Sequence, residues 1–294
     1  MTERLIRLAF ALLARLPLRL NHALGAAIGW CAWVWPTRMR RVSLINLELC
    51  FPERDERWRR RIARQSLMET GKALTEAPWL WRAGPQRIVE LCRGIDGETA
   101  FHEAVAGGHG VFLASPHLGG WEFAGLYAAT RAPMTSLYRP PRQQVLENPM
   151  REGRESTGGR LVPTTTGGIK TLKRALDAGH LIGILPDQTP KRGTGVFAPF
   201  FGHPAYTMVL LPRLAGPRRV PVLVGFARRL PRGRGYRFHC IRAPESIFDP
   251  DPAVAATTLN RVVEELVRQS PEQYAWSYRR FSERPPGMPS PYRR

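Results

Sequence analysis

Four short runs of almost unbroken apolar residues are the feature that most limits the fold of this chain. The segments between and after them show the apolar spacing of helices instead. Strands that are apolar on both faces need cover on both sides, as in a parallel sheet flanked by helices. The sequence therefore predicts an α/β fold with a central, largely parallel sheet flanked by helices. The expected strands are 110–115, 134–138, 181–186 and 220–227, and the expected helices are 121–129, 168–178, 206–214 and 253–269.

Three other segments complete the predicted domain. Residues 54–83 are polar with an apolar stripe, which predicts a long helix. Residues 235–241 alternate between polar and apolar side chains, which fits an antiparallel partner or an edge strand. Residues 284–294 are rich in proline, so we expect a loose tail. Because no linker or internal repeat interrupts the chain, we predict a single α/β domain over residues 37–294.

Residues 1–36 differ from the rest and predict helices that associate with a membrane. Between residues 4 and 20, leucines fall on one side of a helical wheel and arginines on or beside the other, as in helices of the membrane interface. Residues 23–35 are uncharged and end in three tryptophans, but a spanning helix needs about 20 apolar residues. The sequence leaves open whether this segment spans the membrane or lies on it. The alternative is that both helices simply pack on the domain. The leucines are Leu5, Leu8, Leu12, Leu13, Leu16 and Leu20, and the arginines are Arg4, Arg7, Arg15 and Arg19.

The balance of charge limits the partners. Lys plus Arg number 44 against 24 Asp plus Glu, a formal net charge of +20. The electric field of so large a positive charge attracts polyanions: nucleic acid, an anionic membrane, a phosphorylated substrate or an acidic carrier protein. We expect no nucleic acid partner, because the arginines are spread along the chain without a recognition module. The four cysteines form no C-x-x-C pair and the histidines show no H-E-x-x-H spacing, so we predict no metal site.

The stretch GVFLASPHLGGWEF, residues 110–123, carries the candidate chemistry. His117 follows an expected strand, and reactive groups gather beyond the carboxyl ends of strands in open α/β sheets. Gly119 and Gly120 allow a tight turn into a helix whose first turns contain Glu122. A carboxylate bonded to one imidazole nitrogen raises the basicity of the other, so we predict that His117 is a general base paired with Glu122. The alternative is that His117 caps the helix and Glu122 only complements the helix dipole.

The same stretch offers no obvious nucleophile on the enzyme. The chain has no G-x-S-x-G motif, and no cysteine lies near His117 in sequence. The nucleophile can then belong to the substrate, such as a hydroxyl group. A histidine and a carboxylate need no enzyme-bound intermediate if the acyl donor is itself reactive.

The residues around His117 resemble the H-x-x-x-x-D/E motif of glycerolipid acyltransferases, and specifically the late lipid A acyltransferases of Gram-negative bacteria. Many relatives in the wider superfamily have Asp where this chain has Glu122, whereas Glu is familiar in the lipid A branch. Four further blocks resemble segments of that family, in the same order and over most of the chain. They are INLELCFPE (45–53), LYRPPRQQVLENPMREGRESTGGRLVP (137–163), LIGILPDQTPKRGTGVFAPFFGHPAYT (181–207) and SPEQYAWSYRRFSERPPG (270–287).

The resemblance implies a glycerolphosphate-acyltransferase-like fold and an enzyme of lipopolysaccharide biosynthesis. It implies transfer of a fatty acyl group from acyl carrier protein to a hydroxyl of a hydroxyacyl chain on a lipid A precursor. His117 would take the hydroxyl proton, and Glu122 would stabilise the imidazolium. The implied partners are acidic acyl carrier protein, a phosphorylated glycolipid and the anionic inner membrane, with the catalytic domain on the cytoplasmic face. No cofactor is expected, because the phosphopantetheine arm belongs to the carrier protein.

The similar blocks also suggest substrate contacts. We expect Arg139, Arg151 and Arg154 to bind anions, because guanidinium forks match phosphate oxygens. The alternative is that they are solvated surface charges. Asp187 and Gln188 follow an expected strand and are predicted to reach the crevice of His117, with a helix or turn cap as the alternative.

The oxyanion of the reaction needs hydrogen-bond donors. The backbone amides near Gly119 and Gly120, or an arginine, are the candidates in this sequence.

Two other kinds of function remain open. The first is an acyl-CoA-dependent acyltransferase acting on another glycolipid or an amino-acid lipid, as in the similar actinobacterial mannoside acyltransferases, which favour Asp at the position of Glu122. A comparison of acyl-CoA with acyl carrier protein as acyl donor distinguishes this function from the one described above. The second is a non-catalytic basic protein of the membrane surface or of nucleic acid. A protein that binds nucleic acid would show salt-dependent DNA binding that does not change when His117 is lost. A protein of the membrane surface would leave the lipids of the cell unchanged when His117 is replaced by alanine.

Overall fold

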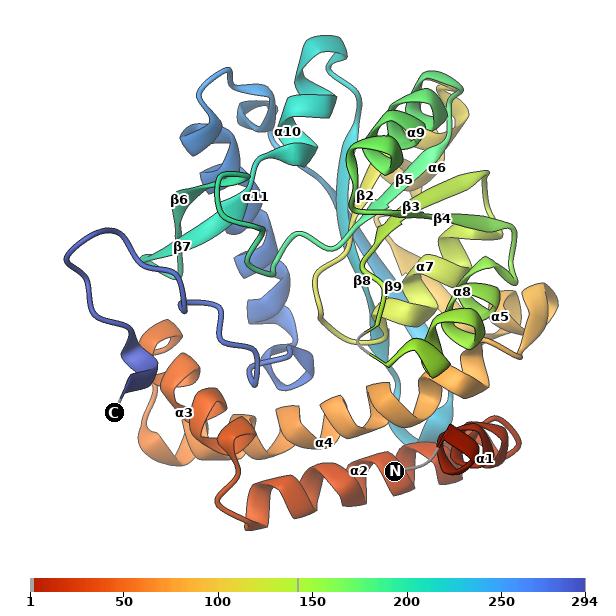
Figure 1. The fold of residues 1–294 in the computed structure, drawn as a ribbon, viewed down its shortest axis with the longest axis vertical. Coiled ribbons are helices and arrows are strands. Elements are labelled where there is room, and N and C mark those ends of the chain that lie inside the picture. The colour runs from red at the N-terminus through yellow and green to blue at the C-terminus, as the bar shows by residue number, and fades with distance from the viewer. Residues whose placement is uncertain (1–2, 142, 294) are drawn as a thin grey trace.

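A seven-stranded sheet forms the centre of the protein, and helices cover both of its faces (Figure 1). The computed structural model describes residues 3–141 and 143–293, without the side chains of Glu3 and Arg7. The strand order is β1-β9-β8-β2-β5-β3-β4, and every neighbouring pair is parallel except β8–β9. The predicted α/β fold with a largely parallel sheet is therefore confirmed, and residues 235–241 are the antiparallel partner. The strands are β1 (Cys92–Asp96), β2 (Val111–Ala114), β3 (Met134–Tyr138), β4 (Gly159–Pro163), β5 (Leu181–Ile184), β8 (Val222–Arg229) and β9 (Tyr236–Arg242).

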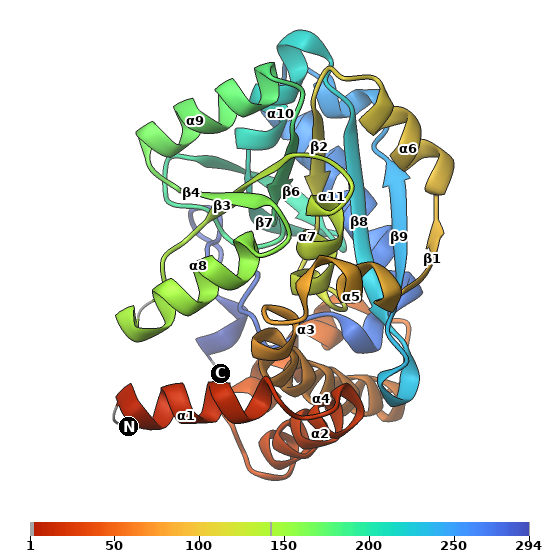
Figure 2. The same cartoon turned by 90° about the vertical axis from the view of Figure 1, so that its right-hand side faces the viewer.

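Strand β2 shows how the sheet divides the core, because its side chains alternate between two apolar layers. Phe112 and Ala114 belong to one layer, and Val111 and Leu113 belong to the other. Figure 2 shows helices on either side of the sheet, with α8 (Glu147–Glu155) near the β4 edge. The first layer is covered by α9 (Thr166–Asp177), α10 (Leu210–Ala215) and α11 (Pro252–Gln269), and the second by α5 (Gly84–Leu91), α6 (Glu98–Ala106) and α7 (Trp121–Ala129).

Residues 206–214, predicted as one helix, contain the end of a strand and the start of a short helix. Strands β6 (Gly195–Phe200) and β7 (His203–Met208) form an antiparallel hairpin, and α10 begins at Leu210. Phe201 and Gly202 both adopt positive φ, 48° and 76°, which is the backbone of a two-residue hairpin turn. The prediction was wrong because the partner strand β6, and not the local spacing of apolar residues, decides the conformation here.

Four helices precede the sheet: α1 (Glu3–Leu13), α2 (Leu18–Val34), α3 (Arg38–Cys50) and α4 (Glu56–Leu80). The last of them confirms the long helix expected within residues 54–83. Helices α2 and α4 run side by side (Figure 1), and they approach closely at glycines, since a Cβ at Gly25 or Gly29 would overlap the backbone of α4. Within residues 3–141 and 143–293, no helix is long and apolar enough to cross a membrane.

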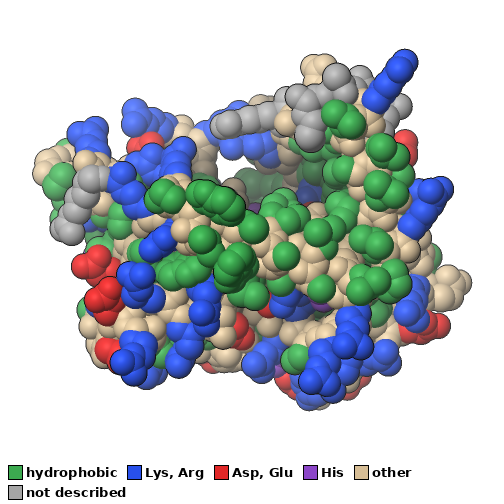
Figure 3. All heavy atoms as spheres, turned by 90° about the horizontal axis from the view of Figure 1, so that it is seen from below, with side chains coloured by type: hydrophobic (Ala, Val, Ile, Leu, Met, Phe, Trp, Pro, Cys, Tyr) green, Lys and Arg blue, Asp and Glu red, His purple; other side chains and the backbone are tan. Residues whose placement is uncertain are grey.

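The outer surface of α1 and α2 is apolar. Figure 3 shows hydrophobic side chains gathered on this face of the molecule, with Lys and Arg side chains around them. Both helices thus pack on the domain and still expose large apolar side chains, many of them the leucines expected on one side of the wheel. The exposed residues are Leu5, Leu8, Leu12, Leu20, Leu24, Ile28, Trp30, Val34 and Trp35.

The C-terminal tail is anchored at its end, contrary to the prediction of a loose segment. Tyr292 is buried, its hydroxyl donates to Asn46 Oδ1 at 2.5 Å, and it accepts from the backbone N–H of Phe281 at 3.1 Å. An aromatic ring near the end of the chain therefore binds the tail to α3, although residues 286–289 remain exposed.

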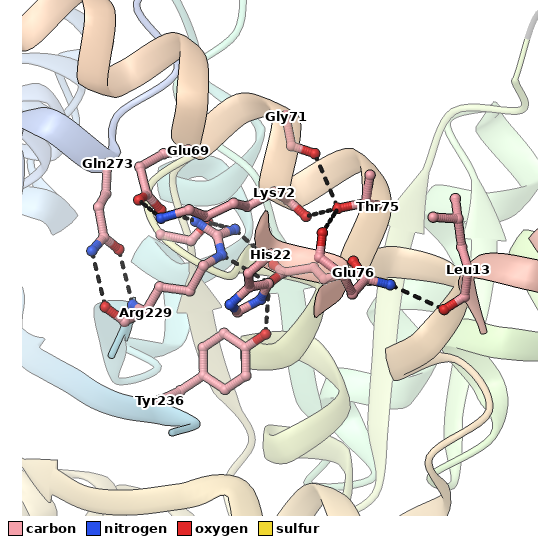
Figure 4. Close-up of polar contacts among 12 residues, drawn as sticks. Leu13, His22, Glu69, Gly71, Lys72, Thr75, Glu76, Arg229, Tyr236 and Gln273 are labelled. Carbon is pink, nitrogen blue, oxygen red and sulfur yellow. Dashed lines mark hydrogen bonds and ion pairs between the residues drawn. The ribbon is translucent and has the colours of Figure 1, made fainter. Parts of the chain in front are cut away.

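A buried cluster of charged groups lies where α2 and α4 meet the sheet (Figure 4). Glu76 of α4 is 1% exposed and accepts hydrogen bonds from Arg229 Nε at 2.8 Å and Nη2 at 2.6 Å. It also accepts from the Tyr236 hydroxyl at 2.7 Å and lies 2.8 Å from His22 Nε2. Burial raises the pKa of Glu76, but the charge of Arg229 and the hydrogen bonds of His22 and Arg229 outweigh it, and the pKa falls to about 2.

This pKa predicts a specific acid sensitivity. In the unfolded chain Glu76 takes up a proton near its ordinary pKa of 4.5, whereas in the folded chain it stays ionised to about 2. The stabilisation is therefore complete above pH 4.5 and is lost as the pH falls through this window, by about 3 kcal/mol. We expect the free energy of unfolding by urea to fall more steeply in the wild type than in Glu76→Gln as the pH falls from 4.5 to about 3, the upper part of this window. Identical pH slopes in the two proteins would contradict the assignment.

Candidate active site

His117 lies where two neighbouring parallel strands end. Strand β2 ends at Ala114 and leads to His117, and its neighbour β5 ends at Ile184 and leads to Asp187. Since both strands run in the same direction, their carboxyl ends open on one edge of the sheet. The sequence-based expectation that Asp187 and Gln188 reach the crevice of His117 agrees with this geometry.

Asp187 is the carboxylate that holds His117. Asp187 Oδ1 lies 2.8 Å from His117 Nδ1, and Oδ2 accepts from the backbone N–H of His117 at 2.9 Å. Asp187 is buried, which raises its pKa, but the charge and hydrogen bonds of His117 outweigh burial and the pKa is lowered. An ionised Asp187 keeps the imidazole proton on Nδ1, so Nε2 carries the free lone pair.

Gln188 contacts that second nitrogen. Its Nε2 lies 3.0 Å from His117 Nε2, as expected if the amide donates to the lone pair. The His117 side chain is 20% exposed, so part of the imidazole faces the outside. The ring of Trp121 lies beside it, with ring centroids 5.3 Å apart. The backbone N–H of the next residue, Thr189, donates to the Tyr278 hydroxyl at 3.0 Å and fixes this segment.

The expected pairing of His117 with Glu122 is wrong. Glu122 instead accepts hydrogen bonds from Arg154 Nε at 2.9 Å and from Trp81 Nε1 at 3.0 Å, and Arg154 Nη2 also contacts it. Burial raises the pKa of Glu122, but the charge of Arg154 outweighs it and the pKa is lowered. Five residues of spacing allowed a contact with His117. The strand order, which the sequence does not reveal, places Asp187 there instead, and Glu122 points toward α8.

The three arginines predicted to bind anions have different surroundings. Arg154 is bound to Glu122, so the surface-charge alternative does not describe it and its guanidinium is not free. Arg151, on the same helix, is half exposed and lies 3.5 Å from Glu155. Arg139 is exposed and follows the end of β3, at the same edge of the sheet as His117. Trp81 was not predicted as a site residue, because its one signal in the sequence is a second tryptophan two residues earlier, Trp79.

The backbone amides proposed for the oxyanion are occupied within the fold. Gly119 N–H donates to the Gln273 carbonyl at 3.0 Å, and Gly120 N–H donates to the Ala227 carbonyl at 2.7 Å. These two amides are therefore not available to an oxyanion, because the glycine turn is bonded to β8 and to the segment around Gln273. The alternative donor, an arginine, stays a prediction. Within the described ranges, no cluster of three His, Cys, Asp or Glu side chains is arranged to hold a metal ion.

Two mostly apolar cavities lie on either side of the Glu122–Arg154–Trp81 cluster. The larger, about 370 Å³, opens between α1, the end of α4 and α8. The smaller, about 70 Å³, opens between α7, β3 and β4. Apolar walls of this kind suit hydrocarbon chains. The larger cavity is lined by Ile6, Phe10, Ala11, Ala14, Pro78, Trp81, Arg82, Val145, Leu146, Pro149, Glu152 and Gly153.

Comparison with known proteins decides the family. The model of the bacterial lipid A biosynthesis acyltransferases matches residues 4–283. The chain belongs to this family. The lipid A biosynthesis lauroyltransferase of Escherichia coli K12 is 29% identical over 96% of this chain and 91% of its own. The palmitoleoyltransferase and the myristoyltransferase of the same organism are 29% and 28% identical, over 95% and 97% of this chain. The chain is thus an acyltransferase of lipid A biosynthesis.

The Glu122–Arg154 pair predicts a difference between two arginines of one helix of this acyltransferase. Arg154→Ala leaves a buried carboxylate with only the Trp81 N–H, and an unpaired buried charge costs several kcal/mol. Because the Arg154 side chain is 29% exposed, water offsets part of this, and we expect a loss of about 2 kcal/mol in the free energy of unfolding. Arg151→Ala, one turn away and half exposed, is the matched control and should cost less than about 0.5 kcal/mol. Equal losses in urea unfolding would contradict the buried pair.

Proposed function

We propose that this acyltransferase moves a fatty acyl group from acyl carrier protein to a hydroxyl of a hydroxyacyl chain on a lipid A precursor, with His117 as general base. The observation that carries the proposal is the environment of His117. A buried carboxylate holds the proton on Nδ1, while Nε2 faces only the Gln188 amide in a partly exposed side chain, at the edge where parallel strands end. This arrangement is suited to removing a proton from a hydroxyl group.

The proposed reaction needs no covalent enzyme intermediate. His117 Nε2 takes the hydroxyl proton as the hydroxyl oxygen attacks the thioester carbonyl, and Asp187 stabilises the imidazolium. The new C–O bond forms, the C–S bond breaks, and the leaving pantetheine thiolate receives the proton from His117. The incoming hydroxyl takes the place of Gln188 at Nε2, and the amide N–H of Gln188 can then donate to the carbonyl oxygen.

The positive net charge of the enzyme supports the proposal that its partners are anionic. Acyl carrier protein is acidic and lipid A precursors carry phosphates, whereas the enzyme has a formal net charge of +20. Arg139 and Arg151 are the exposed candidates for contacts with phosphate, and Arg139 is at the His117 edge of the sheet. Arg154 has a different proposed role, because it holds Glu122 between the two cavities.

We further propose that the apolar face of α1 and α2 lies in the anionic inner membrane, with the catalytic domain on the cytoplasmic side. Exposed leucines and tryptophans bordered by arginines are typical of helices that lie in a lipid interface (Figure 3). The larger cavity is lined partly by α1 and therefore lies next to this face, where lipid chains are available.

Single charges on this face should weaken membrane binding. Leu8 and Ile28 are about half exposed, so Leu8→Glu or Ile28→Glu leaves the fold intact but brings a carboxylate to the lipid. We expect each change to lower partition into vesicles containing phosphatidylglycerol about tenfold, measured by sedimentation. Val254→Glu, at a position 40% exposed on α11, is the control. An equal loss in the control, or none on α1 and α2, would refute the assignment of this face.

A donor comparison tests the reaction itself. Purified enzyme in detergent micelles receives a Kdo-bearing tetra-acylated lipid A precursor with lauroyl or myristoyl acyl carrier protein, or with the matching acyl-CoA. We expect transfer from the carrier protein. Transfer from CoA alone would refute the proposed donor, and absence of transfer to tetra- and penta-acylated precursors would refute the proposed acceptor.

A further inference from the structure

Arg229, the last residue of β8, belongs to the buried charge cluster (Figure 4) and also contacts the turn that follows His117. Its side chain is 2% exposed. Besides its two bonds to Glu76, Nη1 donates to Glu69 at 3.0 Å and Nη2 donates to the carbonyl oxygen of Gly119 at 2.8 Å. The guanidinium thus binds two carboxylates of α4 and one backbone carbonyl of the catalytic turn.

The backbone of Gly119 is held on both sides of its Cα. Its carbonyl accepts from Arg229, and its N–H donates to the Gln273 carbonyl at 3.0 Å. The Gln273 side chain in turn bonds the backbone of Arg229, through Oε1 at 2.9 Å and Nε2 at 3.1 Å. Gly119 has φ of +61°, and a Cβ there would overlap the Ala227 carbonyl, so the turn has little freedom to shift. His117 is only two residues away.

The cluster extends from this turn to the second helix of the chain. Glu76, which binds Arg229, also binds His22 of α2 and the hydroxyl of Tyr236. The Tyr236 ring packs on the next residue of the turn, since a Cβ at Gly120 would lie 2.6 Å from it. His22 is buried on the inner side of α2, while Leu24 and Ile28 are exposed on the outer side.

We propose that Arg229 is a positioning residue for His117, and that Glu76 and His22 extend its support to α2. The proposal rests on the function of His117 proposed above. Buried charges are costly unless all are paired, so the guanidinium keeps one orientation only while Glu76, Glu69 and the Gly119 carbonyl are all in contact. Loss of any partner weakens the restraint that Arg229 places on the Gly119–Gly120 peptide, and a displacement of even about 1 Å at the base can cost on the order of 10²-fold in rate.

Arg229→Lys is the first test. Lysine keeps the charge, but its single ammonium cannot bridge Glu76 and the Gly119 carbonyl as the guanidinium does. We expect kcat for acyl transfer to fall at least about tenfold, with KM for the acyl donor unchanged, because the turn orients the base and does not bind the donor. Thermal unfolding checks that the variant is folded under assay conditions.

His22 provides a test far from the reacting atoms. We expect His22→Ala to lower kcat about threefold to tenfold at unchanged KM, and His22→Gln, whose amide can still donate to Glu76, to recover most of it. His102→Ala removes a histidine that lies near Glu98 on the surface and should have the activity of the wild type. If His22 served stability alone, His22→Ala and His22→Gln would have the same kcat once both variants are folded.

The outcomes distinguish the two proposals. If the wild type transfers acyl groups and His117→Ala does not, but Arg229→Lys and His22→Ala keep the wild-type kcat, the positioning role is wrong and the proposed function stands. The positioning role is equally wrong if kcat falls only in proportion to the unfolded fraction. If the wild type is inactive or His117→Ala is fully active, the proposed function itself fails.

Discussion

His117→Ala should reduce the rate of acyl transfer at least ~100-fold, the contribution typical of a general base. Without the imidazole, Asp187 no longer holds a nitrogen base at this edge of the sheet to take the hydroxyl proton. The exposed methyl group of alanine should leave the sheet and the turn intact. Initial rates with acyl carrier protein as donor give the measurement, and the expected loss is in kcat.

The matched control is His109→Ala. His109 is exposed and lies just before β2, at the opposite end of the strand from His117. Its loss should leave the rate unchanged. If His117→Ala retained the wild-type rate, the interpretation of the H-x-x-x-x-E stretch as a catalytic motif would be wrong.

Asp187→Asn should have the second large effect, on the order of 10³-fold in kcat, by analogy with carboxylate-to-amide changes behind other catalytic histidines. The amide still accepts from the His117 backbone N–H through its oxygen, so the segment should keep its place. Its NH₂ group then faces Nδ1 and donates to it, which moves the imidazole proton to Nε2. The base is then protonated on the nitrogen that must accept the substrate proton.

Asp177→Asn serves as the comparison for this change. Asp177 is partly exposed and pairs with Arg218 at the end of α9, just before β5 and so at the opposite end of that strand from Asp187. We expect it to keep full activity. Because Asp187 is buried, the melting temperature of Asp187→Asn must also be measured. A loss of activity explained entirely by unfolding would assign Asp187 to stability alone.

The sequence revealed most of the fold because its signals are local. The apolar runs around Phe112 and Ile182 are strands that are covered on both faces, and the helical spacing of residues 54–83 became α4. The prediction was wrong where a distant partner decides the conformation. Residues 206–208 pair with β6, and Tyr292 binds Asn46, and neither contact leaves a periodic signal.

The sequence predicted which residues lie at the candidate site, but it did not predict which side chains contact each other there. His117, Asp187 and Gln188 each follow a strand, and parallel strands bring such residues to one edge. The partner of His117 depends on β5 lying beside β2, which only the strand order determines. In the same way, Glu122 meets Arg154 and Trp81 because α8 and the end of α4 approach α7 in space.

The most direct test of the account is fragmentation mass spectrometry of the lipid product made by the wild type and by His117→Ala from lauroyl acyl carrier protein and the tetra-acylated precursor. We predict that the wild-type product gains one acyl group, released as an ester on a hydroxyacyl chain, and that the variant leaves the precursor unchanged. A product acylated elsewhere, or equal product from both proteins, would contradict the account.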